Sequence, residues 1–245
     1  MSTLPEGLPV TGRWLKDNIG CSRQLVQVYV KNNWLDNPCR GIYVRKLSAM
    51  TWQSVALSLQ KVCMRDCYPA GISALQLLGF TQYLPFGEVM RVTLRGNDPV
   101  PLWLSKLQLS TTFQYKRRQL FKCSSVGFAE YPLHGFSDTL KISGVGRAFL
   151  ELLADVSDES SFITAYELFE GMTSLKPQLL GELLAECKSV KVKRLFFLML
   201  EKSGHRWGEK LDLNNYSLGS GKRHIVYGGK LNRKYAITVP EGFND

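Results

Sequence analysis

The feature that most constrains the fold is a pair of short helical patterns joined by a glycine near the start of the chain. Residues 10–20 read VTGRWLKDNIG, in which apolar residues recur at helical spacing. Gly20 suits the C-terminal cap of this helix, and Ser22 suits the N-terminal cap of a second helix, SRQLVQVYVKNN. Two helices that meet at a tight glycine-containing turn are typical of a helix-turn-helix motif.

A hairpin pattern follows the second helix. Asn37, Pro38 and Gly41 punctuate the segment NPCRGIYVRK, and residues 42–44 favour a strand. The second helix has four apolar residues at helical spacing, which we expect to face the core: Leu25, Val26, Tyr29 and Val30. Helix, glycine turn, helix and hairpin, in this order, predict a winged helix-turn-helix domain over residues 1–50.

The pattern changes after residue 50 to short strands mixed with helices. Helical periodicity covers residues 48–66, 70–79, 162–170, 177–187 and 190–204, and TLKISGVGRAFLELLADV passes from strand to helix near Gly144. VMRVTLRG (89–96) and SVGFAEYPLHG have strand character. Since no regular βαβ alternation is present, we predict an α+β fold. The larger mixed α+β domain would span residues 51–245, with a possible sub-boundary near 85–90.

The charge balance favours a polyanionic partner. The 245 residues carry a formal net charge of +10, and nucleic acid is the first candidate for a protein this basic, with a merely basic enzyme as the alternative. The N-terminus lacks a signal peptide, and no apolar run is long enough to span a membrane. We therefore expect a cytoplasmic protein without a membrane partner and with reduced cysteines.

No catalytic or cofactor-binding constellation stands out in the sequence. The six cysteines and three histidines are not spaced as a metal site. LGSGKRH (218–224) lacks the first glycine of a nucleotide-binding phosphate loop and the hydroxyl residue after its lysine. His205 follows Gly204 in a loop and has no evident catalytic partner. We therefore expect no metal, no cofactor and no enzymatic activity.

The polar residues of the helix-turn-helix are the candidates for contact with double-stranded DNA. Recognition helices read base edges from their N-terminal turns, and a wing contacts the backbone or the minor groove. We predict DNA contacts from the cap and exposed face of the second helix, from the wing tip and from its strand: Ser22, Arg23, Gln24, Gln27, Lys31, Arg40 and Arg45. The alternative is a helix-turn-helix that contacts another protein.

A second basic region lies in the last quarter of the chain, with tyrosines between its cations. Lys193 and Arg194 open an apolar helix, where cations are unfavourable to the helix dipole. Lys222 and Arg223 follow a glycine-rich stretch that could present them to an anion. We predict a functional surface made of Lys191, Lys193, Arg194, Lys222 and Arg223. The alternative is that these cations are solvated faces around an apolar helix.

The C-terminal segment from SSFITAYELFEGMTSLKPQLL through SVKVKRLFFLMLEKSG to LGSGKRHIVYGGKLNRKYAITVP resembles the AbiEi antitoxins of type IV toxin–antitoxin and abortive-infection systems. SGVGRAFLELL resembles the family segment in which a strand runs into a helix through an Arg-Ala pair. The resemblance implies a repressor that binds its own promoter and counteracts a nucleotidyltransferase-like toxin, without needing a stable complex with it. The alternative is a nucleic-acid-processing enzyme with an N-terminal DNA-binding module.

Overall fold

The computed structural model describes residues 4–80, 90–117, 119–122 and 125–243, and these residues form two compact units. The first unit contains residues 1–69, 84–118 and 129–142, and the second contains 70–83, 119–128 and 143–245. Small sheets and helices occur together, so the predicted α+β class is confirmed. Apart from Met90, the predicted sub-boundary near 85–90 lies outside the described residues. The boundary near residue 50 stays a prediction.

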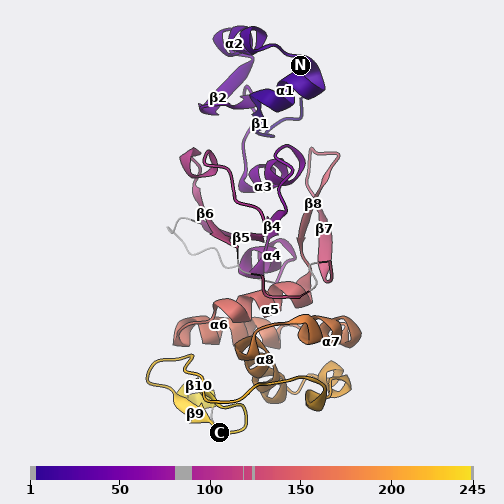
Figure 1. The fold of residues 1–245 in the computed structure, drawn as a ribbon, viewed down its shortest axis with the longest axis vertical. Coiled ribbons are helices and arrows are strands. Elements are labelled where there is room, and N and C mark those ends of the chain that lie inside the picture. Colours follow the sequence, from indigo (N-terminus) through magenta and orange to yellow (C-terminus); the bar gives the residue numbers. More distant parts are fainter. Residues whose placement is uncertain (1–3, 81–89, 118, 123–124, 244–245) are drawn as a thin grey trace. The chain divides into compact units, whose positions relative to one another are not determined.

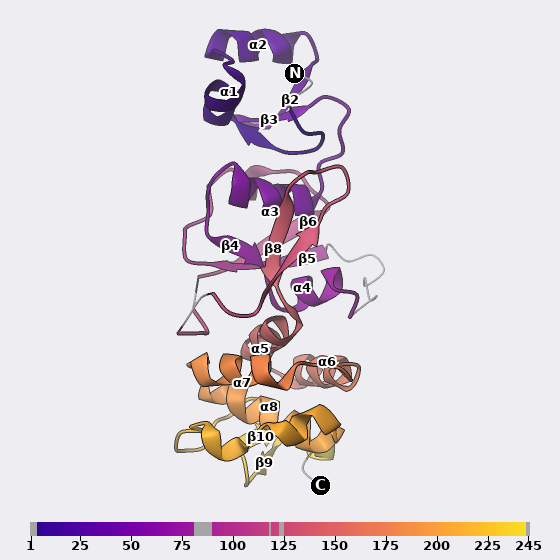
Figure 2. The same ribbon diagram turned by 90° about the vertical axis from the view of Figure 1, so that its right-hand side faces the viewer.

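The N-terminal part of the first unit is a winged helix-turn-helix in its order of elements. These are β1 (Val10–Thr11), α1 (Gly12–Ile19), α2 (Arg23–Lys31), β2 (Leu35–Cys39) and β3 (Ile42–Arg45). The strands pair in the order β1–β3–β2, and both pairs are antiparallel. Figure 2 shows α1 and α2 beside this small sheet. The predicted order of helix, turn, helix and hairpin is therefore present.

The rest of the first unit contains one α-helix and two small sheets, one of three strands and one of two. Its elements are α3 (Trp52–Lys61), β4 (Cys67–Pro69), β5 (Met90–Gly96), the 3₁₀ turn Leu104–Lys106, β6 (Thr111–Lys116), β7 (Phe128–Pro132) and β8 (Thr139–Ser143). The central strand β5 is antiparallel to β4 and parallel to β6, and β7 pairs with β8. The Gln60 side chain donates to Cys67 O at 2.9 Å and to Lys141 O at 2.8 Å, which ties α3 to two other segments.

The second unit is mainly helical. Its elements are α4 (Gly71–Leu77), α5 (Val145–Asp155), α6 (Glu159–Glu170), α7 (Pro177–Glu186), α8 (Val190–Ser203), β9 (Lys230–Asn232), β10 (Ile237–Val239) and the 3₁₀ turns Arg206–Lys210, Leu213–Asn215 and Glu241–Phe243. Figure 1 shows α8 between the layer formed by α5, α6 and α7 and the β9–β10 hairpin. The helices predicted after residue 144 are all present, within a few residues at their ends.

An aromatic core holds these helices together. The rings of Phe149 and Phe169 stack with centroids 4.8 Å apart, and Phe196 meets Phe169 edge-on at 5.8 Å. His205 Nε2 lies 2.8 Å from the carbonyl oxygen of Phe169, and the His205 ring stacks on Trp207. These contacts of His205 hold the loop after α8 against the aromatic core. In the described part of the chain, no helix has the length and apolar character needed to cross a membrane.

Candidate nucleic-acid interface

The turn between α1 and α2 is fixed by two caps. Gly20 has a φ of 72°, a left-handed conformation that glycine adopts without a steric penalty, and its N–H donates to Lys16 O at 3.1 Å. Ser22 then accepts a hydrogen bond at its Oγ from Leu25 N at 3.2 Å, which starts α2. The buried Cys21 lies between the two caps. These contacts confirm the capping roles predicted for Gly20 and Ser22.

The face of α2 that is turned away from the core carries the predicted DNA-contacting side chains. The cap and four residues of the helix are exposed: Ser22, Arg23, Gln24, Gln27 and Lys31. The four helical side chains make no hydrogen bond or ion pair with another described residue. Since α2 contains no acidic residue, its free donors and cations face solvent without compensation. They are thereby available to a nucleic acid.

The wing is short and places one arginine at its tip. Arg40 and Gly41 form the two-residue connection between β2 and β3, and Gly41 has a φ of 83°. Asn37 Nδ2 donates to Cys39 O at 3.0 Å and to Ile42 O at 2.7 Å, which braces this turn from within. The exposed Arg40 therefore lies at the tip of a hairpin that two side-chain hydrogen bonds stabilise, and its contact with DNA stays a prediction.

Arg45 is less available than predicted. Its Nη1 lies 3.0 Å from Glu6 Oε1, and the two side chains are 40% and 70% exposed. Exposed ion pairs contribute roughly 0–1 kcal/mol, so a phosphate could displace Glu6. The DNA-binding role of Arg45 stays a prediction, one that requires the exchange of this partner.

The predicted core face of α2 is corrected at one position. Val26 is buried and Tyr29 and Val30 are half-buried, as expected, but Leu25 is 38% exposed. Val28, which was assigned no role in the sequence, is 48% exposed. Trp34 follows the helix, is 54% exposed and stacks on Tyr29 with centroids 5.4 Å apart. A helical projection centred on Val26 would have placed Val28 outside the core.

The expectation that Lys193 and Arg194 are surface cations is wrong. Both side chains are buried in α8, and Arg194 is only 3% exposed. The Arg194 guanidinium donates to the carbonyl oxygens of Leu218 at 2.8 Å, Gly219 at 3.1 Å, Gly221 at 2.7 Å and Ala236 at 3.1 Å. Burial, and secondarily the charge of Arg223, lowers the pKa of Arg194 from its ordinary value. Through these hydrogen bonds Arg194 holds the loop of residues 218–221 against α8.

Lys191 also has a structural contact. Its Nζ donates to Ala154 O at 3.0 Å and to Val156 O. These carbonyls end α5, where a cation complements the negative end of the helix dipole. Lys191 is therefore held by the chain itself.

Lys222 and Arg223 are exposed, as predicted. The backbone of Arg223 is fixed next to β10, because its N–H donates to Ala236 O at 3.0 Å and its carbonyl accepts from Thr238 N at 3.0 Å. Since Arg194 binds Gly221 O, the predicted pairs do lie close together, but only Lys222 and Arg223 face outward. They are the remaining candidates for the predicted functional surface.

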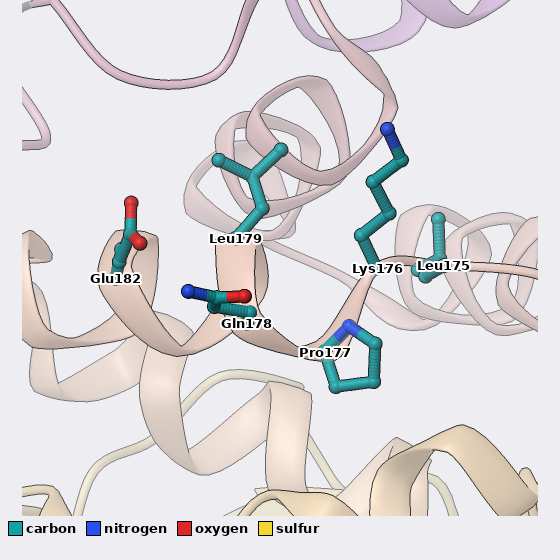
Figure 3. Close-up of a pocket in the computed structure, with 6 residues that line it drawn as sticks. All are labelled: Leu175, Lys176, Pro177, Gln178, Leu179 and Glu182. Atoms are coloured by element: carbon teal, nitrogen blue, oxygen red, sulfur yellow. The ribbon is translucent and has the colours of Figure 1, made fainter.

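A hollow at the start of α7 carries no reactive group. Figure 3 shows its lining, which is formed by Leu175, Lys176, Pro177, Gln178, Leu179 and Glu182. These residues offer one cation, one carboxylate and one amide beside apolar groups, without a nucleophile and its base. Among the described residues, no three His, Cys, Asp or Glu side chains gather as a metal site would require.

Two protein-family models together match nearly the whole chain. The sequence model described as "Transcriptional regulator, AbiEi antitoxin N-terminal domain" matches residues 1–86. The one described as "Transcriptional regulator, AbiEi antitoxin, Type IV TA system" matches residues 89–240. No curated protein has significant sequence similarity to the chain. The crystal structure of the RV2827C protein from Mycobacterium tuberculosis superposes with a TM-score of 0.60, 14% identity and coverage of 95% of this chain and 86% of that one. That likeness concerns the fold.

Proposed function

Since the chain belongs to the AbiEi antitoxins, the transcriptional regulators of type IV toxin–antitoxin systems, we propose that it represses its own promoter through α2 and the wing. The observation that carries this proposal is the exposed, acid-free face of α2, with Arg23, Gln24, Gln27 and Lys31 unengaged by the rest of the chain. The glycine turn before α2 and the hydrogen bonds of Asn37 in the hairpin that carries Arg40 also support the proposal.

The second part of the proposal is the antagonism of a nucleotidyltransferase-like toxin, without a requirement for a stable complex. Lys222 and Arg223 are our candidates for this activity. A guanidinium can bind a phosphate through two parallel hydrogen bonds, whereas an ammonium acts as a point charge. The loop that carries them is anchored by Arg194 and by β10, so both cations project from a fixed backbone. The proposal contains no catalytic step by this chain.

Arg23→Ala and Gln27→Ala are each expected to weaken binding to the promoter of the chain's own operon. A lost base contact costs on the order of 1–3 kcal/mol, or about fivefold to more than a hundredfold in the dissociation constant. Fluorescence anisotropy with a labelled promoter fragment at fixed salt measures this change. Lys202→Ala in the second unit is the control for the loss of an exposed cation, and its affinity should stay within about twofold. Wild-type affinity in both α2 variants would contradict α2 as the reader.

Lys222→Ala/Arg223→Ala is expected to impair rescue of growth from the co-expressed toxin, while the melting temperature stays near that of the wild type. The side chains are exposed, and surface substitutions typically change stability by less than about 0.5 kcal/mol. Lys202→Ala/Arg206→Ala removes the same charge from other exposed positions of the second unit and is the matched control. Growth curves at equal protein levels measure rescue. Full rescue by the folded Lys222/Arg223 variant would show that these cations are only solvated surface residues without a role in antitoxin activity.

A further inference from the structure

The exposed side of α2 is not uniformly polar. The core is contacted through Val26, which is 3% exposed, whereas Val28 is the most exposed apolar residue of the helix at 48%. Successive residues turn by about 100° around a helix. Gln24 and Val28 both fall almost opposite Val26, and four-residue spacing makes them neighbours. The line along α2 that is farthest from the core therefore consists of a glutamine and a valine, with the cations to one side.

This pair matches the chemistry of an A·T base pair in the major groove. Adenine presents N7 and the N6 amino group, which a glutamine can address with two hydrogen bonds, and thymine presents a C5 methyl group to an apolar side chain. Both side chains are available to DNA, because Gln24 has no hydrogen-bond partner among the described residues and Val28 is 48% exposed. We propose that Gln24 and Val28 together read an A·T base pair of the operator, with Val28 packed on the thymine methyl.

The surroundings of Val28 favour DNA over a second copy of the chain. Lys31 and Arg23 are exposed on the same helix, Arg40 is exposed on the wing, and α2 has no acidic residue. A symmetric dimer through this face would bring like charges together, because each copy would meet the same patch. A phosphate backbone provides the opposite charge on both sides of the groove. The inference rests on the proposed repressor function and specifies which bases α2 reads.

The test is a cycle between Val28→Ala and the replacement of thymine by deoxyuridine, which removes the C5 methyl and keeps base pairing. Within the footprint, each thymine is replaced in turn and the dissociation constant is measured by anisotropy. We expect at least one position where the replacement weakens wild-type binding about fourfold, as for one methyl-sized apolar group. Val28→Ala should bind the methylated and unmethylated forms of that site equally.

Two controls separate methyl recognition from other effects. Ile163→Ala truncates an apolar residue of α6 that is 39% exposed, and it should keep the wild-type preference for thymine. Lys31→Ala should weaken both DNA forms by the same factor, because a phosphate contact carries no base information. An unchanged preference in Val28→Ala, or no preference in the wild type, overturns the inference and leaves the repressor function intact.

Two further outcomes also overturn the inference. Absence of any promoter binding by the wild type would remove the proposed function as well. A shift from dimer to monomer in Val28→Asp by analytical ultracentrifugation, with unchanged thymine preference in Val28→Ala, would instead assign the face to self-association.

Discussion

Arg194→Ala is expected to lower the free energy of unfolding by about 3 kcal/mol or more, because it removes the buried guanidinium and its four charge-assisted hydrogen bonds to backbone carbonyls. In the native structure the guanidinium bridges α8 to the oxygens of Leu218, Gly219, Gly221 and Ala236, which lie 24 to 42 residues along the chain. Urea unfolding followed by circular dichroism measures the loss.

The choice of arginine at this position is itself testable. Arg194→Lys keeps the charge, but an ammonium cannot reproduce the flat fork that addresses four oxygens from one site, so we expect it to recover only part of the stability. Lys202→Ala removes an exposed cation from the same helix and should change stability by less than about 0.5 kcal/mol. An Arg194→Ala protein as stable as the wild type would show that the four hydrogen bonds do not hold the loop.

Variants of Arg194 can also distinguish a structural role in the loop from direct contact by Lys222 and Arg223 in the proposed antitoxin activity. The residue binds the carbonyl of Gly221, directly before Lys222 and Arg223. Loss of Arg194 would therefore release the loop that presents these two cations. If both Arg194→Ala and the Lys222/Arg223 variant lose rescue, but only the first loses stability, then Arg194 acts by positioning and the exposed pair by contact.

The N-terminal motif could be predicted from sequence because its signals are local. Gly20 and Ser22 mark a helix end and a helix start within three residues, and both caps form as expected. Apolar spacing likewise predicted the helices of the second unit. The exposure of Leu25 and Val28 was harder to predict, because an apolar residue beside the core stripe of a short helix can face either way.

The burial of Lys193 and Arg194 could not be predicted from local sequence. Lysine and arginine are almost never fully buried unless paired, so a basic pair at a helix start favours a surface interpretation. The partners of Arg194 are backbone carbonyls distant in sequence, and carbonyl positions leave no residue-type signature. The parallel pairing of β5 with β6 was missed for a related reason, since it depends on a crossover rather than on either strand alone.

Glu151→Ala and Arg147→Ala are each expected to destabilise the protein by about 3–5 kcal/mol, because each removes one member of a buried ion pair. The two side chains are 1% and 4% exposed, and Arg147 Nε lies 3.1 Å from Glu151 Oε1. Glu151 Oε2 also accepts from Ser143 Oγ at 2.7 Å and from Gly71 N at 3.2 Å. The carboxylate of Glu151 in α5 thus binds Ser143 and Gly71, and all three residues belong to the second unit.

A double-mutant cycle isolates the pair, and the chain contains its own control. In α1, Arg13 also lies four residues before an acidic residue, Asp17. Its Nε is 3.4 Å from Asp17 Oδ2, and the two side chains are 91% and 55% exposed. Burial is the main difference between the two pairs. We expect a coupling energy of several kcal/mol for Arg147 and Glu151, and of about 0.5 kcal/mol or less for Arg13 and Asp17. Equal coupling in the two cycles would show that burial does not set the strength of this ion pair.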